Sequence, residues 1–198
     1  MAEAALVTGF ADPVREAQAV FRAVMMALAR PGTLRAITPP PPPPSPLDAG
    51  LAAIAMALCD FETRVWLDAP LAASDAVSGY LRFQTGAPLT EDPAAAAFAL
   101  VSDPSALTGL AGFAQGTPDY PDRSTTLVMA VPSLIEGEGW TLRGPGIDGT
   151  ARLAVGGLPA GSAGWLADNR SQFPLGVDLV FVAGNRVAAL PRSTAVTA

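Results

Sequence analysis

The chain has 198 residues, half of them hydrophobic, which is enough for one globular domain with a sizeable core. It contains no histidine, all 12 of its basic residues are arginine, and it has one cysteine, which excludes an imidazole base, a lysine Schiff base, an intrachain disulfide and a cysteine-rich metal or cluster site. The net charge of −6 and the scattered arginines exclude a broad nucleic-acid surface.

The clearest predicted element is a helix from Asp12 to Arg30. Asp12 is a good N-cap, Pro13 suits the first helical position, and the following Pro31-Gly32 ends the helix. Apolar residues recur every three or four positions and are expected to form its buried face: Val14, Ala17, Phe21, Val24, Met25 and Leu28.

A proline-rich segment follows at residues 39–46. An unbroken proline run favours polyproline II, so we predict a stiff surface loop. Such a run can also dock into an aromatic groove, but no basic residue flanks it as an anchor.

The rest of the chain alternates between helical and strand patterns. We predict helices at 47–59, 71–83, 104–109 and 159–170. We predict strands at 63–67, 94–101, 125–131, 140–143 and 151–155, and a final hairpin of 177–183 and 186–190 joined through Gly184-Asn185. The strands lack alternating polar positions and no long linker divides the chain, so we expect one α/β domain over residues 1–198, with a mixed sheet covered by helices.

Two features bear on where the protein resides. No stretch of about 18 consecutive apolar residues is present, and Asp12, Arg15 and Arg22 interrupt the most apolar N-terminal stretch, so we predict no membrane-spanning helix. The same stretch lacks the basic start and cleavage site of a secretory signal, and we expect a cytoplasmic protein.

Gly144, Gly146 and Gly149 spell the G-x-G-x-x-G pattern of dinucleotide-binding loops. That loop requires a strand before it and a helix after it, whereas residues 151–155 predict a strand. We therefore interpret the glycines as turn residues. The backbone amides of this turn, with Arg143 beside them, could also hold an anion.

Polar residues near the end of the 71–83 helix form another candidate site. Arg82, Gln84 and Thr85 are suited to hold a polar ligand or the backbone of a partner, although on residue type alone a capped helix terminus explains them better. Asp178 begins a predicted strand and is expected to pair with backbone amides or an arginine.

Carboxylate pairs occur at Asp60 with Glu62 and at Asp119 with Asp122. Such pairs in loops are usually solvated or cap neighbouring turns, and neither has a motif beside it that indicates magnesium or acid-base chemistry. We therefore predict no metal site and no catalytic residue in this chain.

Several sequence blocks, in order, resemble the PhnH family of the bacterial carbon-phosphorus lyase pathway. The blocks are Phe21-Arg22 with Arg30-Pro31-Gly32, residues 62–67, Leu81-Arg82-Phe83 with Thr85, residues 142–147, residues 173–179 and residues 190–194. The sequence departs from the family at Gln84, where histidine is common, and at Ser193, where threonine is usual. Glutamine can form hydrogen bonds but cannot titrate, so a proton-transfer role is not expected at position 84.

The resemblance implies a fold similar to a reduced pyridoxal-phosphate-dependent transferase without the cofactor. The absence of lysine agrees with this independently. The resemblance also implies a homodimer that joins sister subunits in a complex transferring ribosyl triphosphate from ATP to a phosphonate such as methylphosphonate. Cleavage of the carbon-phosphorus bond would belong to a sister subunit.

Three functional hypotheses follow. The first is a non-catalytic assembly subunit of this complex, without a cofactor of its own. The alternative is a ligand-binding subunit in which Arg82, Thr85, Arg143 and Arg192 hold the phosphates of a nucleotide or phosphonate for a partner's active site. The third is a free-standing interaction domain that docks through the proline run.

Overall fold

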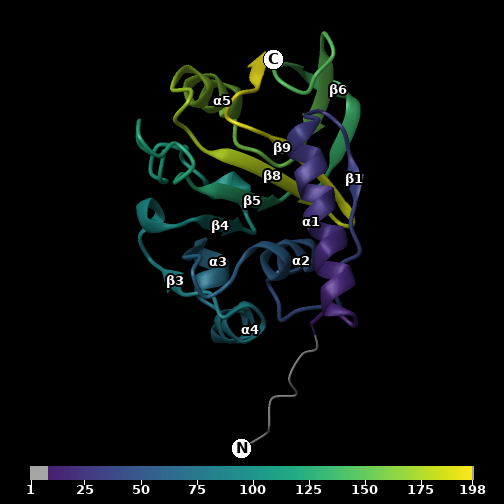
Figure 1. Cartoon of the computed structure of the whole chain (residues 1–198), viewed down its shortest axis with the longest axis vertical. Helices are drawn as coiled ribbons and strands as arrows, with labels where there is room; N and C mark the ends of the chain where they lie inside the picture. The colour runs from purple at the N-terminus through teal and green to yellow at the C-terminus, as the bar shows by residue number, and fades with distance from the viewer. Residues whose placement is uncertain (1–8, 198) are drawn as a thin grey trace, which may run out of the picture.

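The computed structural model describes residues 9–197 and shows two β-sheets with helices packed around them (Figure 1). The helices in this part of the chain are α1 (Pro13–Ala29), α2 (Ala49–Leu58), α3 (Ala69–Ala72), α4 (Asp75–Thr85) and α5 (Ser162–Ser171), with short 3-10 turns η1 (Pro93–Ala95) and η2 (Pro104–Ala106). The strands are β1 (Arg35–Ala36), β2 (Val65–Leu67), β3 (Leu89–Thr90), β4 (Phe98–Val101), β5 (Thr126–Ala130), β6 (Leu134–Arg143), β7 (Ala151–Val155), β8 (Asp178–Ala183), β9 (Arg186–Leu190) and β10 (Ala195–Thr197).

The larger sheet has seven strands in the order β1-β9-β8-β5-β4-β2-β3. Strands β3, β2, β4, β5 and β8 are parallel, whereas β9 pairs antiparallel with both β8 and β1. The smaller sheet is antiparallel, in the order β10-β6-β7. The predicted α/β fold with a mixed sheet is therefore confirmed.

Both faces of the large sheet are buried. Val128 on β5 and Val180 on β8 belong to a hydrophobic cluster with α1, α2 and α4. Their neighbours Leu127, Met129 and Phe181 point the other way, into a second cluster with the small sheet and α5. Since adjacent strand residues face opposite sides, this arrangement explains why β5 and β8 are apolar at every position after their first residue.

Helix α1 begins and ends as predicted, and Val24 and Leu28 face the core as predicted, but three residues of the predicted face do not. The Asp12 side chain accepts a hydrogen bond from the Arg15 amide and Pro13 opens the helix. The buried residues are Val20, Ala23, Val24 and Ala27, while Val14, Phe21 and Met25 are exposed. The apolar pattern covers a wider arc than the neighbouring elements can bury, and the residues that face α2 and β9 include the small Ala23 and Ala27.

Other predicted boundaries also change. The helix predicted at 71–83 is two helices, because the Asp68 side chain caps α3 and the Ser74 side chain caps α4. The helix predicted at 104–109 is the 3-10 turn η2, and the first residues of the strand predicted at 94–101 lie in η1. The short strands β1, β3 and β10 were not predicted, because two or three residues carry no measurable periodicity.

The proline-rich segment forms the loop between β1 and α2, as predicted. Its first part is not fully exposed, since Pro40 is buried, whereas Pro41 and Pro42 are exposed. No helix in the described range 9–197 is both long and apolar enough to cross a membrane. The expectation about a secretory signal concerns the N-terminus, where residues 1–8 lie outside the described part.

The three glycines of the G-x-G-x-x-G pattern lie in the turn between the antiparallel strands β6 and β7, so the turn interpretation is confirmed. All three have positive φ angles. Gly146 has φ +80° and lies against the C-terminal end of α1, where an added Cβ would stand 2.0 Å from the Ala29 carbonyl oxygen. Gly149 has φ +68° and no atom within 4 Å of the equivalent position.

These two glycines provide a test of the packing between the turn and α1. Gly149→Ala should cost only the left-handed backbone penalty, about 1–2 kcal/mol. Gly146→Ala should cost about 3 kcal/mol or more, because the alanine also collides with backbone that cannot move freely. Urea unfolding of both variants measures the difference, and equal losses would show that the turn does not pack tightly on α1.

Candidate functional site

Asp178 and Arg192 form a partly buried ion pair with several hydrogen bonds. The Arg192 Nη2 donates to Asp178 Oδ2 at 2.6 Å, and the Arg192 Nε and backbone N–H donate to Oδ1 at 3.1 and 2.8 Å. The Arg192 Nη1 donates to the Pro121 carbonyl. The predicted pairing of Asp178 is therefore confirmed. The guanidinium fork of Arg192 is engaged, and a phosphate would have to displace Asp178 to bind it.

Arg143 and Gly144 lie next to this pair in the fold. Arg143 ends β6 opposite Ala195 of β10. A Cβ on Gly144 would lie 3.0 Å from the Ser193 carbonyl oxygen, so the turn packs closely on the segment that carries Arg192. The side chain of Arg143 is exposed and forms no ion pair within residues 9–197.

The second predicted group lies at the end of α4. Thr85 donates from its hydroxyl to the Leu81 carbonyl at 2.7 Å and accepts the Ala87 N–H at 3.0 Å, and Gly86 follows in the left-handed conformation. Thr85 thus caps the helix. Arg82 is exposed in the last turn, and the Gln84 side chain lies against Gly9.

The structure does not bring these two groups together. Helix α4 lies at one end of the molecule, whereas β6 and the C-terminal segment lie at the other (Figure 1). Arg82 and Thr85 therefore cannot share one phosphate with Arg143 and Arg192 in this chain.

Asp68 occupies the position where an open α/β sheet usually binds a ligand. The chain passes from β2 to β3 on one side and then to β4 on the other, so the strand order reverses between β2 and β4. Ligands of such sheets bind at the carboxyl ends of the two strands that flank the reversal. Here Asp68 follows β2, is 6% exposed, and accepts the backbone N–H groups of Ser102 at 2.6 Å and Asp103 at 2.9 Å.

The Asp68 carboxylate also accepts the Ser102 hydroxyl and the Leu71 N–H. A carboxylate of the chain itself thus uses the amide donors that an anionic ligand would need. Sequence reasoning missed Asp68, although its place between an apolar strand and Pro70 is a recognisable signal for an N-cap.

The carboxylate pairs show no sign of chemistry. Asp60 accepts the Glu62 N–H at 2.9 Å and so stabilises a local turn. Asp119 and Asp122 are exposed in a loop. Within the described range, no three carboxylate or cysteine side chains come close enough to hold a metal ion.

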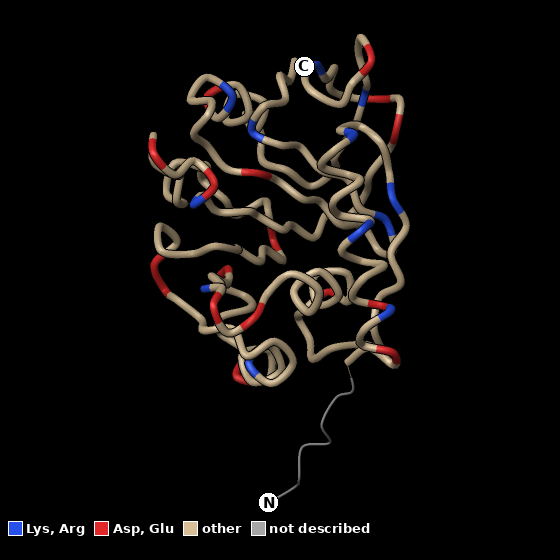
Figure 2. Tube along the Cα trace, in the orientation of Figure 1, with Lys and Arg blue, Asp and Glu red and all other residues tan. Residues whose placement is uncertain are grey.

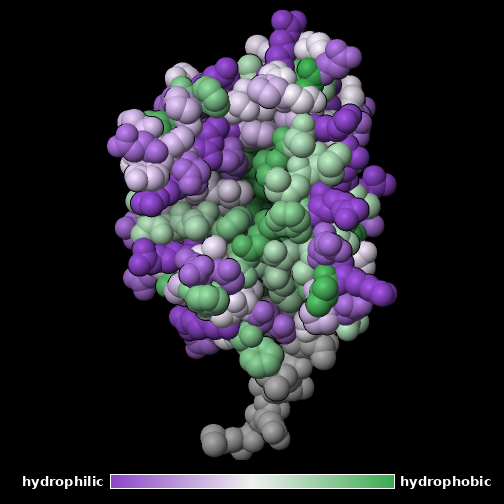
Figure 3. Space-filling model, viewed as in Figure 1, coloured by the Kyte–Doolittle hydropathy of each residue, from purple (hydrophilic) through white to green (hydrophobic). Residues whose placement is uncertain are grey.

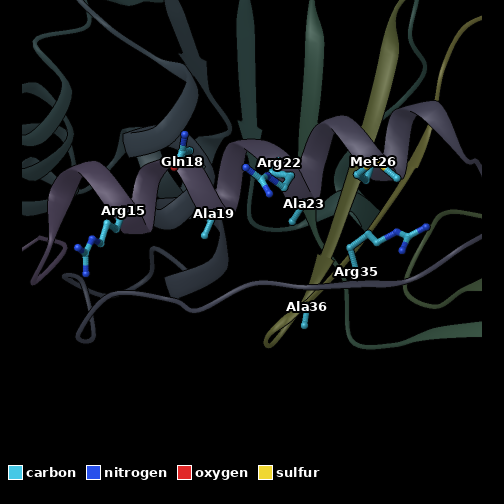
Figure 4. Close-up of a pocket in the computed structure, with 8 residues that line it drawn as sticks. All are labelled: Arg15, Gln18, Ala19, Arg22, Ala23, Met26, Arg35 and Ala36. Atoms are coloured by element: carbon cyan, nitrogen blue, oxygen red, sulfur yellow. The ribbon is translucent and has the colours of Figure 1, made fainter.

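Arginines line an open groove of about 440 Å³ between α1 and β1 (Figure 4). Arg15 and Arg22 come from α1 and Arg35 from β1, and the small side chains Ala19 and Ala23 lie between them. Figure 2 shows arginine positions gathered along this side of the molecule. The helical spacing of Arg15 and Arg22 was readable from the sequence, but the approach of β1 was not.

Comparison with known proteins shows the family. The profile of the family described as "Bacterial phosphonate metabolism protein (PhnH)" matches residues 8–197. The chain belongs to the PhnH family. The matched range spans the whole described part of the chain.

Two relatives are informative. The chain is 43% identical over 185 residues to "Alpha-D-ribose 1-methylphosphonate 5-triphosphate synthase subunit PhnH" from Rhizobium meliloti (strain 1021), which covers 93% of this chain and 92% of that protein. It is 40% identical over 79 residues to "Putative C-P lyase subunit protein HtxG" from Stutzerimonas stutzeri, which covers 40% of each chain.

The contribution of Arg192 to stability can be measured directly. Arg192→Ala should lower the free energy of unfolding by about 2–3 kcal/mol, because it leaves the partly buried Asp178 carboxylate without its charged donor. Arg192→Lys should recover little, since lysine lacks the planar fork. A double-mutant cycle with Asp178→Ala, followed by urea unfolding, should show that the two losses are not additive.

A control is available in the exposed Arg15–Asp12 pair, whose charged atoms are 3.6 Å apart. Arg15→Ala should leave stability unchanged, because exposed ion pairs contribute little. If Arg192→Ala is as stable as the parent protein, the pair is not the structural contact inferred here.

The lone cysteine should be unreactive in the folded protein. Burial, followed by the nearby charge of Asp60, raises the pKa of the Cys59 thiol to about 12. At pH 8 we expect iodoacetamide to label the folded chain at least roughly a hundredfold more slowly than the urea-unfolded chain, because only the thiolate reacts. The unfolded chain also releases this proton at lower pH than the folded chain, so the thiol lowers stability as pH rises toward 12. Rapid labelling of the folded chain would contradict this assignment.

Proposed function

We propose that this chain is a subunit of α-D-ribose 1-methylphosphonate 5-triphosphate synthase and that it serves assembly rather than chemistry. The observation that carries the proposal is the 43% identity, over 93% of the chain, to a protein with that name. The complex would transfer ribosyl triphosphate from ATP to methylphosphonate during phosphonate catabolism.

The assembly role is supported by how the polar groups are used. Asp68 fills the position at which such sheets usually hold a ligand, and Arg192 is bound to Asp178. The sequence offers neither histidine nor lysine for proton transfer or covalent catalysis. Asp68 and Arg192, which lie at positions suited to a ligand, therefore stabilise the fold instead.

The proposal extends to fold relationship and location. We propose a reduced pyridoxal-phosphate-dependent transferase fold without the cofactor, supported by the parallel strands and the absence of lysine. We also propose one domain over residues 1–198, of which 1–8 and 198 lie outside the described part, because both hydrophobic clusters share the large sheet. We further propose that the protein is cytoplasmic, forms a homodimer and joins sister subunits of the complex.

A ligand-binding role is the second candidate. Arg82 and Arg143 are exposed and form no ion pair within residues 9–197, so each is free to contact a phosphate. Because they lie at opposite ends of the molecule, each would complete a different site on a partner. Arg82→Ala and Arg143→Ala should lower turnover without lowering subunit recovery if this role holds.

The decisive experiment is co-expression of the tagged chain with the other synthase proteins of its own genome. After affinity purification in 0.15 M salt, mass measurement should show the sister subunits in stoichiometric amounts, and the purified chain alone should show no turnover of ATP with methylphosphonate. Turnover by the chain alone would overturn the assembly role. Recovery of the chain without any sister subunit would overturn membership in the complex.

A further inference from the structure

Helix α1 presents a row of apolar side chains to solvent. Val14 is 79% exposed, Phe21 48% and Met25 46%. At 100° per residue these positions fall within about 40° of one another around the helix, so they lie on one side of it. Figure 3 shows apolar surface over α1 and in the hollow beside it. Large apolar side chains that gather on one exposed face indicate an interaction surface.

A row of arginines runs beside this stripe. Arg15 directly follows Val14 and Arg22 directly follows Phe21, so each arginine lies about 100° further around the helix than its apolar neighbour. Arg35 faces them across the groove between α1 and β1. We call Val14, Phe21, Met25 and these three arginines the α1 surface.

The positive charges of the α1 surface are poorly compensated. Within residues 9–197, Arg22 and Arg35 form no ion pair, and Arg15 contacts only Asp12, at 3.6 Å between exposed side chains. The Nε of Arg35 is buried without a hydrogen-bond partner among the described residues, while its Nη2 donates to Thr33 at 3.3 Å. The guanidinium groups of Arg15 and Arg22 are on exposed residues, so they can receive carboxylate acceptors from outside.

We propose that the α1 surface is the docking site for a different subunit, one that presents apolar side chains flanked by carboxylates. This inference rests on the proposed membership in a multi-subunit complex and names where one contact lies. The apolar stripe would provide the buried centre of the contact and the arginines its charged border.

Charge argues against a second copy of this chain as the occupant. A twofold contact brings the same surface together from both copies, so Arg22 and Arg15 of one copy would face the arginines of the other. Like charges placed together across an interface disfavour association. The homodimer proposed above would therefore use another face.

Geometry argues against a small anion. Arg15 and Arg22 are about 10 Å apart along the helix axis. Figure 4 shows the three guanidinium groups pointing apart along the open groove instead of converging on one point. Sites for small ligands are enclosed and have convergent polar groups, whereas this surface matches an extended acidic face.

The test uses two independent double variants in the co-expression experiment. F21Q/M25Q removes the apolar stripe, and R15E/R22E reverses the charge. Each should reduce recovery of sister subunits at least tenfold, while the melting temperature and the homodimer remain as in the parent chain. Recovery by the parent chain should also decline as salt rises from 0.05 to 0.5 M, because the contact is partly ionic.

A matched control is Y120Q/R123E. Tyr120 is 51% exposed, and the Arg123 guanidinium lies 4.1 Å from the centre of its ring, so this loop carries the same residue types outside α1. The control should recover all sister subunits.

The outcomes separate this inference from the proposed function. If the parent chain and both α1 variants recover the sister subunits equally, the docking site is wrong and membership in the complex stands. If the parent chain recovers none, the proposed function fails and this inference fails with it. Loss of the homodimer alone in either α1 variant would assign the surface to a second copy and overturn the inference.

A melting experiment with pyrophosphate tests whether the α1 surface binds a small anion instead. Pyrophosphate at millimolar concentration should leave the melting temperature of the parent chain and of R15E/R22E equally unchanged. A rise confined to the parent chain, together with full recovery of sister subunits by R15E/R22E, would identify an anion site and overturn docking.

Discussion

Burial of the central strands on both faces is the constraint on which the rest of the structure depends. Val128 and Val180 face one hydrophobic cluster, and Leu127 and Phe181 face the other. Apolar side chains on both sides of a strand require a covering layer on each side, since exposing them to water is unfavourable. Helices α1, α2 and α4 cover one face, and the small sheet with α5 covers the other.

This two-sided covering also determines how the polar groups are used. Strands that lie deep inside the protein end in backbone N–H groups that need acceptors. Asp68 meets this need between β2 and β4, and Asp178 with Arg192 joins the start of β8 to the segment after β9. Asp178 and Arg192, which suggest a site in the sequence, are thereby part of the scaffold, whereas Arg82, Arg143 and the arginines beside α1 keep their charges at the surface.

The surface of α1 follows from the same packing. Its small residues Ala23 and Ala27 face inward because α2 and β9 come close, which leaves the larger Phe21 and Met25 outside. A helix that kept its large residues inside would stand further from the sheet. The cost of this close approach is an apolar stripe in water, and a subunit contact over that stripe removes the cost.

The α/β class, the caps of α1, the hairpin of β8 and β9 and the glycine turn were predictable from the sequence, because each depends on residues that are neighbours along the chain. The family was predictable too, through blocks distributed over nearly the whole length. The pairing of Asp178 was foreseen, but its partner Arg192 was not, since a hydrogen bond between distant segments leaves no local pattern. Only the tertiary structure decided which side of α1 is buried, that Arg82 and Arg143 lie apart, and that Arg35 approaches Arg15 and Arg22. These features depend on how close two elements can pack, and the side-chain periodicity of one element does not contain that distance.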